Sequence, residues 1–290
     1  MTIFHEAWWL DAVAPGNWSD IAQSADVDRW PFVLRPGPGP IKRVQGPPLT
    51  PRLGPLIGSV SAETDLSRWS QRLREMAAAL PPSTIFRQAF HPGISYWLPL
   101  EWDGFQQTQY FSMVIRDTSD LELVRRQYSK GTRSDRKKAA HHVELRVDQP
   151  IAELYAALTE TLSRSGRAAP YPLETLERAF AASVARGRGR HISAHSQGRY
   201  IAGGFFVWDQ ARMYYLVGGS RAVSRGTGAP TLIIDSAIAL ASQKSLEFDC
   251  EGSRIPSIER FFRSFGAKPE GYSLVSKSSR WVRALESMKQ

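Results

Sequence analysis

The stretch from Leu246 to Ala267 constrains the fold of this 290-residue chain more than any other. It starts as a short strand that ends on two carboxylates, Asp249 and Glu251, and a Gly-Ser turn follows. Pro256 then opens an amphipathic helix, because proline is tolerated in the first helical turn. Gly266 ends that helix, where a left-handed residue is needed. Acids at a strand end that face a helix N-terminus are typical of functional sites in α/β folds.

The charge balance is strongly basic, with a net charge of +9 and a pI of about 9.8. An excess of Lys and Arg favours polyanionic partners such as tRNA or nucleotide-linked substrates, although a solvated basic surface explains it equally well. Cys250 is the single cysteine, which excludes an intrachain disulfide and a cysteine metal cluster. The N-terminus lacks a signal-peptide pattern, and no run of about 18 apolar residues occurs. The sequence therefore predicts a cytoplasmic protein without a membrane span.

The periodicity after Val143 predicts the order β-α-α-β-β-β-α-β-α-β, which indicates a mixed α/β fold and excludes a pure Rossmann sheet. Helices are expected at 151–164, 173–186, 230–243 and 256–265. The first half is less regular. A helix is expected at 63–80, and the Pro/Gly-rich residues 36–58 are expected to form a long loop with short extended pieces.

Three sets of residues resemble Fem-like transferases, a branch of the GNAT acyltransferase superfamily. They are the aromatic block 90–108, the basic block 132–139, and a C-terminal set made of 214–220, 226–229 and 249–266. The resemblance implies two GNAT-like lobes, each a mostly antiparallel twisted sheet flanked by helices. It also implies transfer of an acyl or aminoacyl group to an amine, with aminoacyl-tRNA, acyl-CoA or acyl-carrier protein as donor. The chain lacks the tRNA-gripping helical hairpin of the peptidoglycan-bridge members.

We therefore expect an N-terminal lobe at 1–129 on the acceptor side, which includes loop 36–58, and a C-terminal acyltransferase lobe at 130–290. The first function expected is transfer of an aminoacyl group from aminoacyl-tRNA to the amine of a small molecule or peptide, with tRNA as a partner. An acyl-CoA-dependent N-acyltransferase is the alternative within the same class. A non-enzymatic nucleic-acid-binding module and a scaffold that binds neither donor are the alternatives from other classes. No tightly bound cofactor and no metal are expected, because the donor is a co-substrate.

The loop from Arg225 to Pro230 is the candidate phosphate site. GNAT acyl-CoA enzymes carry a glycine loop before a helix here, whose backbone amides hold the pyrophosphate. Pro230 lacks an N–H, so the match is partial, and a flexible turn is the alternative. Arg133, Arg136 and Lys137 share a helix face that suits phosphates or a solvated surface. The predicted donor-binding residues are Arg133, Arg136, Lys137, Ser220, Arg225, Gly226, Gly228 and Ala229.

Asp249 and Glu251 are the catalytic candidates. Two residues apart on a strand, they would share one face, and a carboxylate in a low-dielectric site can take the proton of an attacking ammonium group. A contact with the ammonium group of the substrate is an equally favoured functional role. Capping of the next helix, or pairing with Arg254 and Arg260, is the structural alternative. The aromatic block offers an acceptor groove, with core packing as its alternative. The predicted acceptor-binding residues are Trp97, Trp102, Gln106, Gln107, Tyr215 and Arg254.

Overall fold

The computed structural model describes residues 2–23, 27–279 and 282, and it divides the chain into two compact units. Unit 1 contains residues 1–110 and 271–290, and unit 2 contains residues 111–270. The predicted lobe boundary at 129/130 falls inside unit 2, between helices α4 (Leu121–Arg126) and α5 (Lys130–Ala140). Helix α4 belongs to unit 2 because its Arg125 forms an ion pair with Asp235 of that unit.

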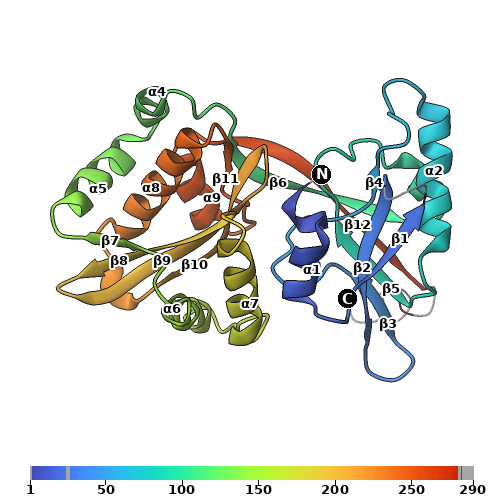
Figure 1. Cartoon of the computed structure of the whole chain (residues 1–290), viewed down its shortest axis with the longest axis horizontal. Coiled ribbons are helices and arrows are strands. Elements are labelled where there is room, and N and C mark those ends of the chain that lie inside the picture. Colours follow the sequence, from blue (N-terminus) through green and yellow to red (C-terminus); the bar gives the residue numbers. More distant parts are fainter. Residues whose placement is uncertain (1, 24–26, 280–281, 283–290) are drawn as a thin grey trace. The chain divides into compact units, whose positions relative to one another are not determined.

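Unit 1 has the strand order β1-β2-β3-β5-β12, with β4 paired to β2. Its strands are β1 (Ser19–Gln23), β2 (Asp28–Pro36), β3 (Lys42–Gln45), β4 (Leu56–Ile57), β5 (Ile85–Ala89) and β12 (Lys268–Ser278), whose first three residues belong to unit 2. These neighbours pair antiparallel except β3 and β5, which are parallel. The helices are η1 (Ile3–His5), α1 (Ala7–Val13), α2 (Leu66–Ala79) and α3 (Leu98–Trp102) (Figure 1). Helix α3 lies in the predicted aromatic loop, and its five residues are too few to give a periodic signal.

Unit 2 has the strand order β6-β11-β10-β9-β8-β7. Its strands are β6 (Gln106–Ile115), β7 (Glu144–Val147), β8 (Gly189–Ser196), β9 (Arg199–Trp208), β10 (Arg212–Ser220) and β11 (Glu247–Asp249). The boundary at 110/111 falls within β6, so that the start of this strand belongs to unit 1. Besides α4 and α5, it contains α6 (Ala152–Ser163), α7 (Leu173–Val184), η2 (Ala222–Ser224), α8 (Ala229–Gln243) and α9 (Pro256–Arg263). The chain order from β7 to β12 is the order predicted from the sequence. The predicted mixed α/β fold with mostly antiparallel sheet is confirmed.

The pairing of β10 and β11 is the feature of unit 2 that positions the site. The two strands run parallel and pair only over Arg212–Tyr214 and Glu247–Asp249. Strand β11 ends there, whereas β10 continues to Ser220 and pairs with β9 on its other side, with a bulge after Tyr215. Among the described residues, the last part of β10 therefore keeps one edge without a strand partner.

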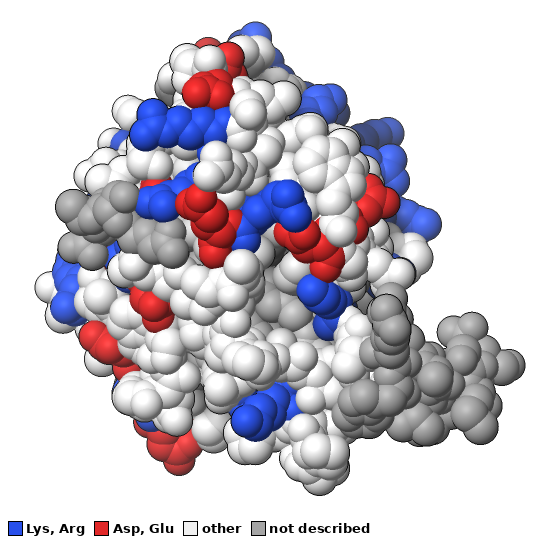
Figure 2. Space-filling model, turned by 90° about the vertical axis from the view of Figure 1, so that its right-hand side faces the viewer, with Lys and Arg blue, Asp and Glu red and all other residues white. Residues whose placement is uncertain are grey.

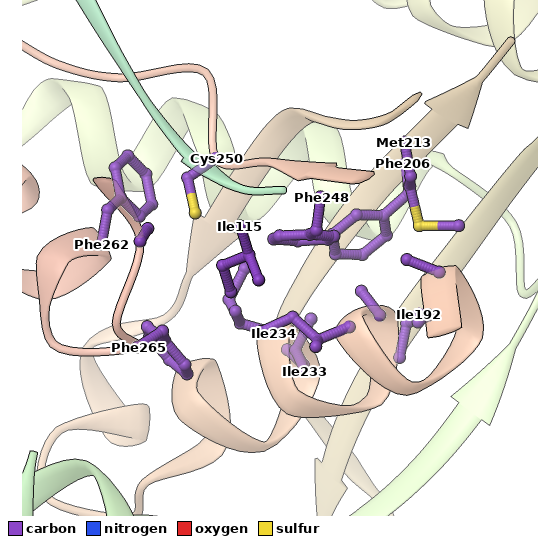
Figure 3. Close-up of a cluster of buried hydrophobic side chains, with 14 of the residues drawn as sticks. Ile115, Ile192, Phe206, Met213, Ile233, Ile234, Phe248, Cys250, Phe262 and Phe265 are labelled. Atoms are coloured by element: carbon purple, nitrogen blue, oxygen red, sulfur yellow. The ribbon is translucent and has the colours of Figure 1, made fainter. Parts of the chain in front are cut away.

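The core of unit 2 fills the space between the sheet and helix α8 (Figure 3). Phe206, Phe248, Ile233 and Ile234 point into it, and α9 adds aromatic side chains. Phe205, next to Phe206 in β9, packs instead on Phe180 of α7. Because neighbouring strand residues point to opposite faces, α7 and α8 cover opposite faces of this sheet (Figure 1).

Candidate active site

A pocket of about 180 Å³ lies along the part of β10 that extends beyond its pairing with β11. Strands β9 and β10 contribute Ala202, Gly203, Tyr215, Gly218, Gly219 and Ser220. The helices contribute Thr161, Pro230, Ile233, Ile258, Phe261 and Phe262. Two of the residues predicted from the sequence, Ser220 and Tyr215, therefore line the same pocket.

Two glycines of β10 give this pocket its shape. A Cβ atom on Gly218 would lie 1.7 Å from the Tyr215 hydroxyl, and one on Gly219 would lie 2.5 Å from the backbone nitrogen of Leu158. A larger residue would displace the phenol at the first position and helix α6 at the second. Burial raises the pKa of Tyr215, so its hydroxyl stays neutral and can serve as a hydrogen-bond donor.

The turn before α8 is built by left-handed glycines. Gly226 has φ +68° and Gly228, the N-cap of α8, has φ +75°. A Cβ on Gly228 would lie 2.4 Å from the carbonyl oxygen of Asp135, so only glycine allows α5 to pack this closely. The Ala229 N–H donates to the Thr227 hydroxyl at 3.1 Å, while Arg225 is exposed.

Lys138 is a contact of this turn that the sequence analysis missed. Its ammonium group donates to the Gly226 carbonyl oxygen at 2.6 Å. The predicted basic stripe lies on the neighbouring helix face, which carries Arg133, Arg136 and Lys137. Only the position of the turn relative to α5 distinguishes Lys138 from the other cations of this basic run.

The predicted basic stripe on α5 is largely engaged by unit 2 itself. The Arg133 guanidinium donates to the carbonyl oxygens of Arg126, at 3.2 Å, and of Tyr128. A guanidinium nitrogen of Arg136 lies 3.6 Å from a carboxylate oxygen of the buried Asp235. Lys137 is exposed. The role of these three cations in phosphate binding stays a prediction.

Asp249 and Glu251 have different surroundings. Asp249 ends β11 with 0% exposure, accepts from the Ser112 hydroxyl, and lies 3.2 Å from a nitrogen of Arg212. Glu251 is only partly buried, and its N–H donates to Asp249 at 2.8 Å. With φ +68°, Glu251 lies outside the strand, so the alternation expected to align the two side chains stops at Asp249. The catalytic role of both residues stays a prediction.

Arg212 holds Asp249 as one member of a larger ion-pair group that the sequence analysis did not single out. Its guanidinium lies 2.5 Å from Glu247, 3.2 Å from Asp249 and 2.5 Å from Glu270. Burial lowers the pKa of Arg212, but the hydrogen bond that Arg212 donates to Glu270 and the charges of Asp249 and Glu270 outweigh burial and raise it. Asp249 is thus bound to a cation within unit 2.

The predicted acceptor-binding residues are divided between the units. Tyr215 and Arg254 belong to unit 2, where Arg254 is exposed in the loop before α9. The other four belong to unit 1: Trp97, Trp102, Gln106 and Gln107. Trp102 is 63% exposed and, with Lys277, lines a groove of about 1170 Å³ beside α2. Trp97 packs partly buried against the core, as the alternative reading expected.

The two glutamines at the start of β6 have separate surroundings. Gln106 is exposed. The Gln107 amide donates to Gln109 at 2.9 Å and to the Ser273 hydroxyl at 3.1 Å, both within unit 1. Acceptor binding by these residues stays a prediction.

None of the helices in the described part of the chain is both long and apolar enough to cross a membrane. No group of three or more His, Cys, Asp or Glu side chains within this part of the chain is arranged to hold a metal ion.

Comparison with known proteins identifies the fold around this pocket. Residues 124–251 match the family model of the acetyltransferase (GNAT) domain. The structure of FemX is similar at 11% identity, covering 93% of this chain and 91% of FemX, with a TM-score of 0.70. No curated protein matches the sequence at a significant level.

Two other solved structures extend this comparison. The C-terminal domain of a protein described as a lysylphosphatidylglycerol synthetase, from Agrobacterium fabrum, gives 12% identity, 98% and 91% coverage and a TM-score of 0.61. A tandem GNAT protein from the clavulanic acid biosynthesis pathway gives 13% identity, 92% and 85% coverage and a TM-score of 0.51. Residues 124–251 therefore match a GNAT domain model, and the predicted resemblance to Fem-like GNAT acyltransferases is confirmed at the level of fold.

Proposed function

We propose that this chain, whose second unit carries a GNAT domain, transfers an acyl group to an amine and forms an amide bond. The unpartnered edge of β10 beside the pocket carries this proposal. The acyl end of the donor lies in the pocket, and the phosphates of its carrier lie toward the glycine turn before α8. That turn lies at the positive end of a 15-residue helix.

In the reaction, the amine nitrogen forms a bond to the acyl carbonyl carbon, and the bond from that carbon to the carrier breaks. The ammonium proton must be removed before or during attack, and the carrier leaves as a thiol or hydroxyl group. Backbone N–H groups on the open edge of β10 are suited to polarise the carbonyl oxygen. Holding both reactants beside that edge supplies the favourable orientation.

A CoA-type thioester is the first donor candidate. The matched family is described as acetyltransferases, and two of the three cations of the predicted basic stripe on α5 are engaged within unit 2. On the face drawn in Figure 2, basic and acidic side chains are interspersed, and uncharged surface lies between the groups of charged side chains. Aminoacyl-tRNA, the donor first expected from the sequence, is the second candidate, supported by the net charge of +9.

The amine acceptor of this proposal is a small molecule or a peptide. The groove beside α2 lies within unit 1, and its exposed Trp102 offers a large flat surface for an apolar group. Replacing Trp102 with alanine leaves the donor site of unit 2 unchanged and therefore separates acceptor binding from donor binding.

Gly228→Ala should weaken acetyl-CoA binding at least about tenfold, because the new Cβ would displace the turn from Asp135. Isothermal titration calorimetry measures the affinity. Gly16→Ala is the matched control: its φ of +65° imposes a similar strain in unit 1, but nothing lies within 4 Å of the new Cβ. Equal affinities for the two variants would contradict the phosphate site.

A gel shift with total aminoacylated tRNA tests the second donor. Aminoacyl-tRNA would become the proposed donor if the wild-type protein gave a shift that Lys137→Glu abolished, and if calorimetry gave no heat signal with acetyl-CoA. A phosphate contact made by Lys137 should also reduce the salt dependence of the complex by about one unit of log–log slope when it is removed.

Glu251→Gln should lower kcat by about 100-fold, because a general base contributes about that factor. Asp249→Asn should instead lower stability, because it removes the charge that faces Arg212. Turnover of a donor thioester with a panel of amines, together with thermal unfolding, measures both effects. Unchanged turnover in Glu251→Gln would remove Glu251 as the base.

A further inference from the structure

We propose that unit 1 binds a small phosphate-bearing molecule through Arg35, Arg43 and Arg87, three arginines on one face of the strands β2, β3 and β5. The site is made only of unit 1 residues, whereas the pocket beside β10 is made of unit 2 residues. It goes beyond the proposed function, because it does not depend on acyl transfer. Guanidinium groups recognise this ligand class, since each can donate two parallel hydrogen bonds to phosphate oxygens.

The strand register brings the three arginines together. Arg35 of β2 lies directly opposite Arg43 of β3 in an antiparallel pair. Strand β5 pairs with the other side of β3, where Arg87 lies beside Gln45, two positions along the strand from Arg43. Residues two apart on a strand share a face, and paired neighbours point to the same side of a sheet. All three arginine side chains therefore leave the same face of the sheet of unit 1.

This arrangement places like charges next to each other without a counter-charge. Two cations directly opposite each other on neighbouring strands repel and destabilise the pair. In the described part of the chain, none of the three guanidinium groups forms a hydrogen bond or an ion pair, and Arg35 and Arg87 are exposed. Asp20 of the adjacent strand β1 is already paired with Arg29, at 2.6 Å. A bound anion would supply the charge that the fold omits.

The segments that form these strands contain no acid that could serve instead. No Asp or Glu occurs at 29–62 or at 76–100. Asp28, at the start of β2, is buried and accepts from Arg72 and from the Ser59 hydroxyl, both at 2.6 Å. On the far side of β5, the residue of β12 that pairs with Arg87 is Ser276. The potential on this face is therefore positive, and it favours an anionic ligand.

A hollow of about 240 Å³ beside Arg87 gives the anion a place to bind. Gln45 and Thr50 contribute further polar side chains to its lining. The Thr50 hydroxyl already donates to the Pro48 carbonyl oxygen, at 3.0 Å. The Gln45 amide has no partner among the described residues, so it can donate to a phosphate oxygen beside the Arg87 guanidinium. The hollow is open, so the phosphate group can belong to a larger molecule.

The grouping of the cations favours a small ligand over a nucleic acid or a lipid surface. A phosphodiester chain or a membrane is bound by many cations spread along a surface. The three arginines of this site instead occupy neighbouring positions on three adjacent strands. Several other arginines of unit 1 already form ion pairs, namely Arg29, Arg72 and Arg74. One or two phosphate groups suffice to neutralise the site.

Calorimetry with the full-length chain and inorganic pyrophosphate tests this site, with sodium chloride at equal ionic strength as the reference. Arg43→Gln and Arg87→Gln should each weaken binding at least about tenfold, because each removes a charge-assisted contact. Arg68→Gln is the matched control, since Arg68 is an exposed arginine of unit 1 that lies on α2. Saturating acetyl-CoA should leave this binding unchanged, because it competes only at the turn before α8.

Arg35→Gln gives a readout that a merely structural arginine would not give. In the absence of ligand and at low salt, removal of one of the two opposed charges should raise the midpoint of thermal unfolding, and high salt should abolish the gain. Pyrophosphate should raise the midpoint of the wild-type protein more than that of Arg87→Gln. Arg68→Gln should show neither effect.

Three outcomes would overturn the inference. The first is no binding of pyrophosphate by the wild-type protein. The second is an equal loss of affinity in Arg68→Gln and Arg87→Gln. The third is binding of RNA or of vesicles with anionic lipid that Arg43→Gln abolishes, while pyrophosphate does not bind, because the face would then serve a macromolecular surface. All three leave the proposed acyl transfer intact, since turnover of a donor thioester with an amine is measured separately.

Discussion

Replacing Arg212 with methionine should lower the free energy of unfolding by about 3–5 kcal/mol. Arg212 is the cation that three carboxylates share, at 2.5 Å from Glu247, 3.2 Å from Asp249 and 2.5 Å from Glu270. Methionine keeps much of the side-chain length but removes the charge. Asp249, with 0% exposure, would then be left as a buried anion beside two other acids. The loss arises mainly from that uncompensated carboxylate.

Urea unfolding followed by tryptophan fluorescence measures this loss, and Arg116→Met provides the control. Arg116 also pairs with Glu270, at 2.7 Å, but its side chain is 60% exposed. An exposed ion pair contributes about 1 kcal/mol or less, so the control variant should stay near the wild type. A similar loss in both variants would show that Asp249 does not depend on Arg212 for its stability.

The order of elements in unit 2 could be predicted because each signal is local. Pro256 and Gly266 mark the two ends of α9 in the sequence, and the structure begins that helix at Pro256 and places Gly266 at φ +80° after it. The glycines before α8 are likewise visible as a turn, and both have positive φ. Local steric rules act on a few neighbouring residues, so the sequence suffices for them.

The partners of the candidate site residues could not be predicted, because they are distant in sequence. Arg136 and Asp235 are 99 positions apart, and Arg212 and Asp249 are 37 apart. A basic stripe and a pair of acids look available in the sequence, whereas the fold pairs Arg136 and Asp249 with groups of opposite charge. The lobe boundary is difficult to predict for the same reason. Helix α4 contacts unit 2 through Asp235, which is far from α4 in the sequence.

Lowering the pH from 6.5 to about 4 should remove about 3 kcal/mol of unfolding free energy through His91 alone. Burial lowers the pKa of His91 from its ordinary value of 6.5 to about 4. Burial also lowers the pKa of His5, and the neighbouring His91 lowers it further. The two rings meet edge to face at 5.4 Å, and His91 Nε2–H donates to the Pro55 carbonyl oxygen at 3.1 Å. Both imidazoles are therefore held neutral in unit 1.

The sign follows from where each state takes up the proton. Above pH 6.5, His91 is neutral in both the folded and the unfolded chain, and its contribution to the free energy of unfolding is at its maximum. As the pH falls toward 4, only the unfolded chain binds the proton, so stability falls by up to about 1.4 kcal/mol per pH unit for each such histidine. Below about pH 4, His91 is protonated in the folded chain too, and the free energy of unfolding no longer falls on account of His91.

Urea unfolding from pH 7 to 4.5 measures the slope of unfolding free energy against pH. This slope should be shallower in His91→Gln and unchanged in the exposed control His142→Gln. Parallel curves for the wild type and His91→Gln would show that His91 accepts a proton in the folded protein.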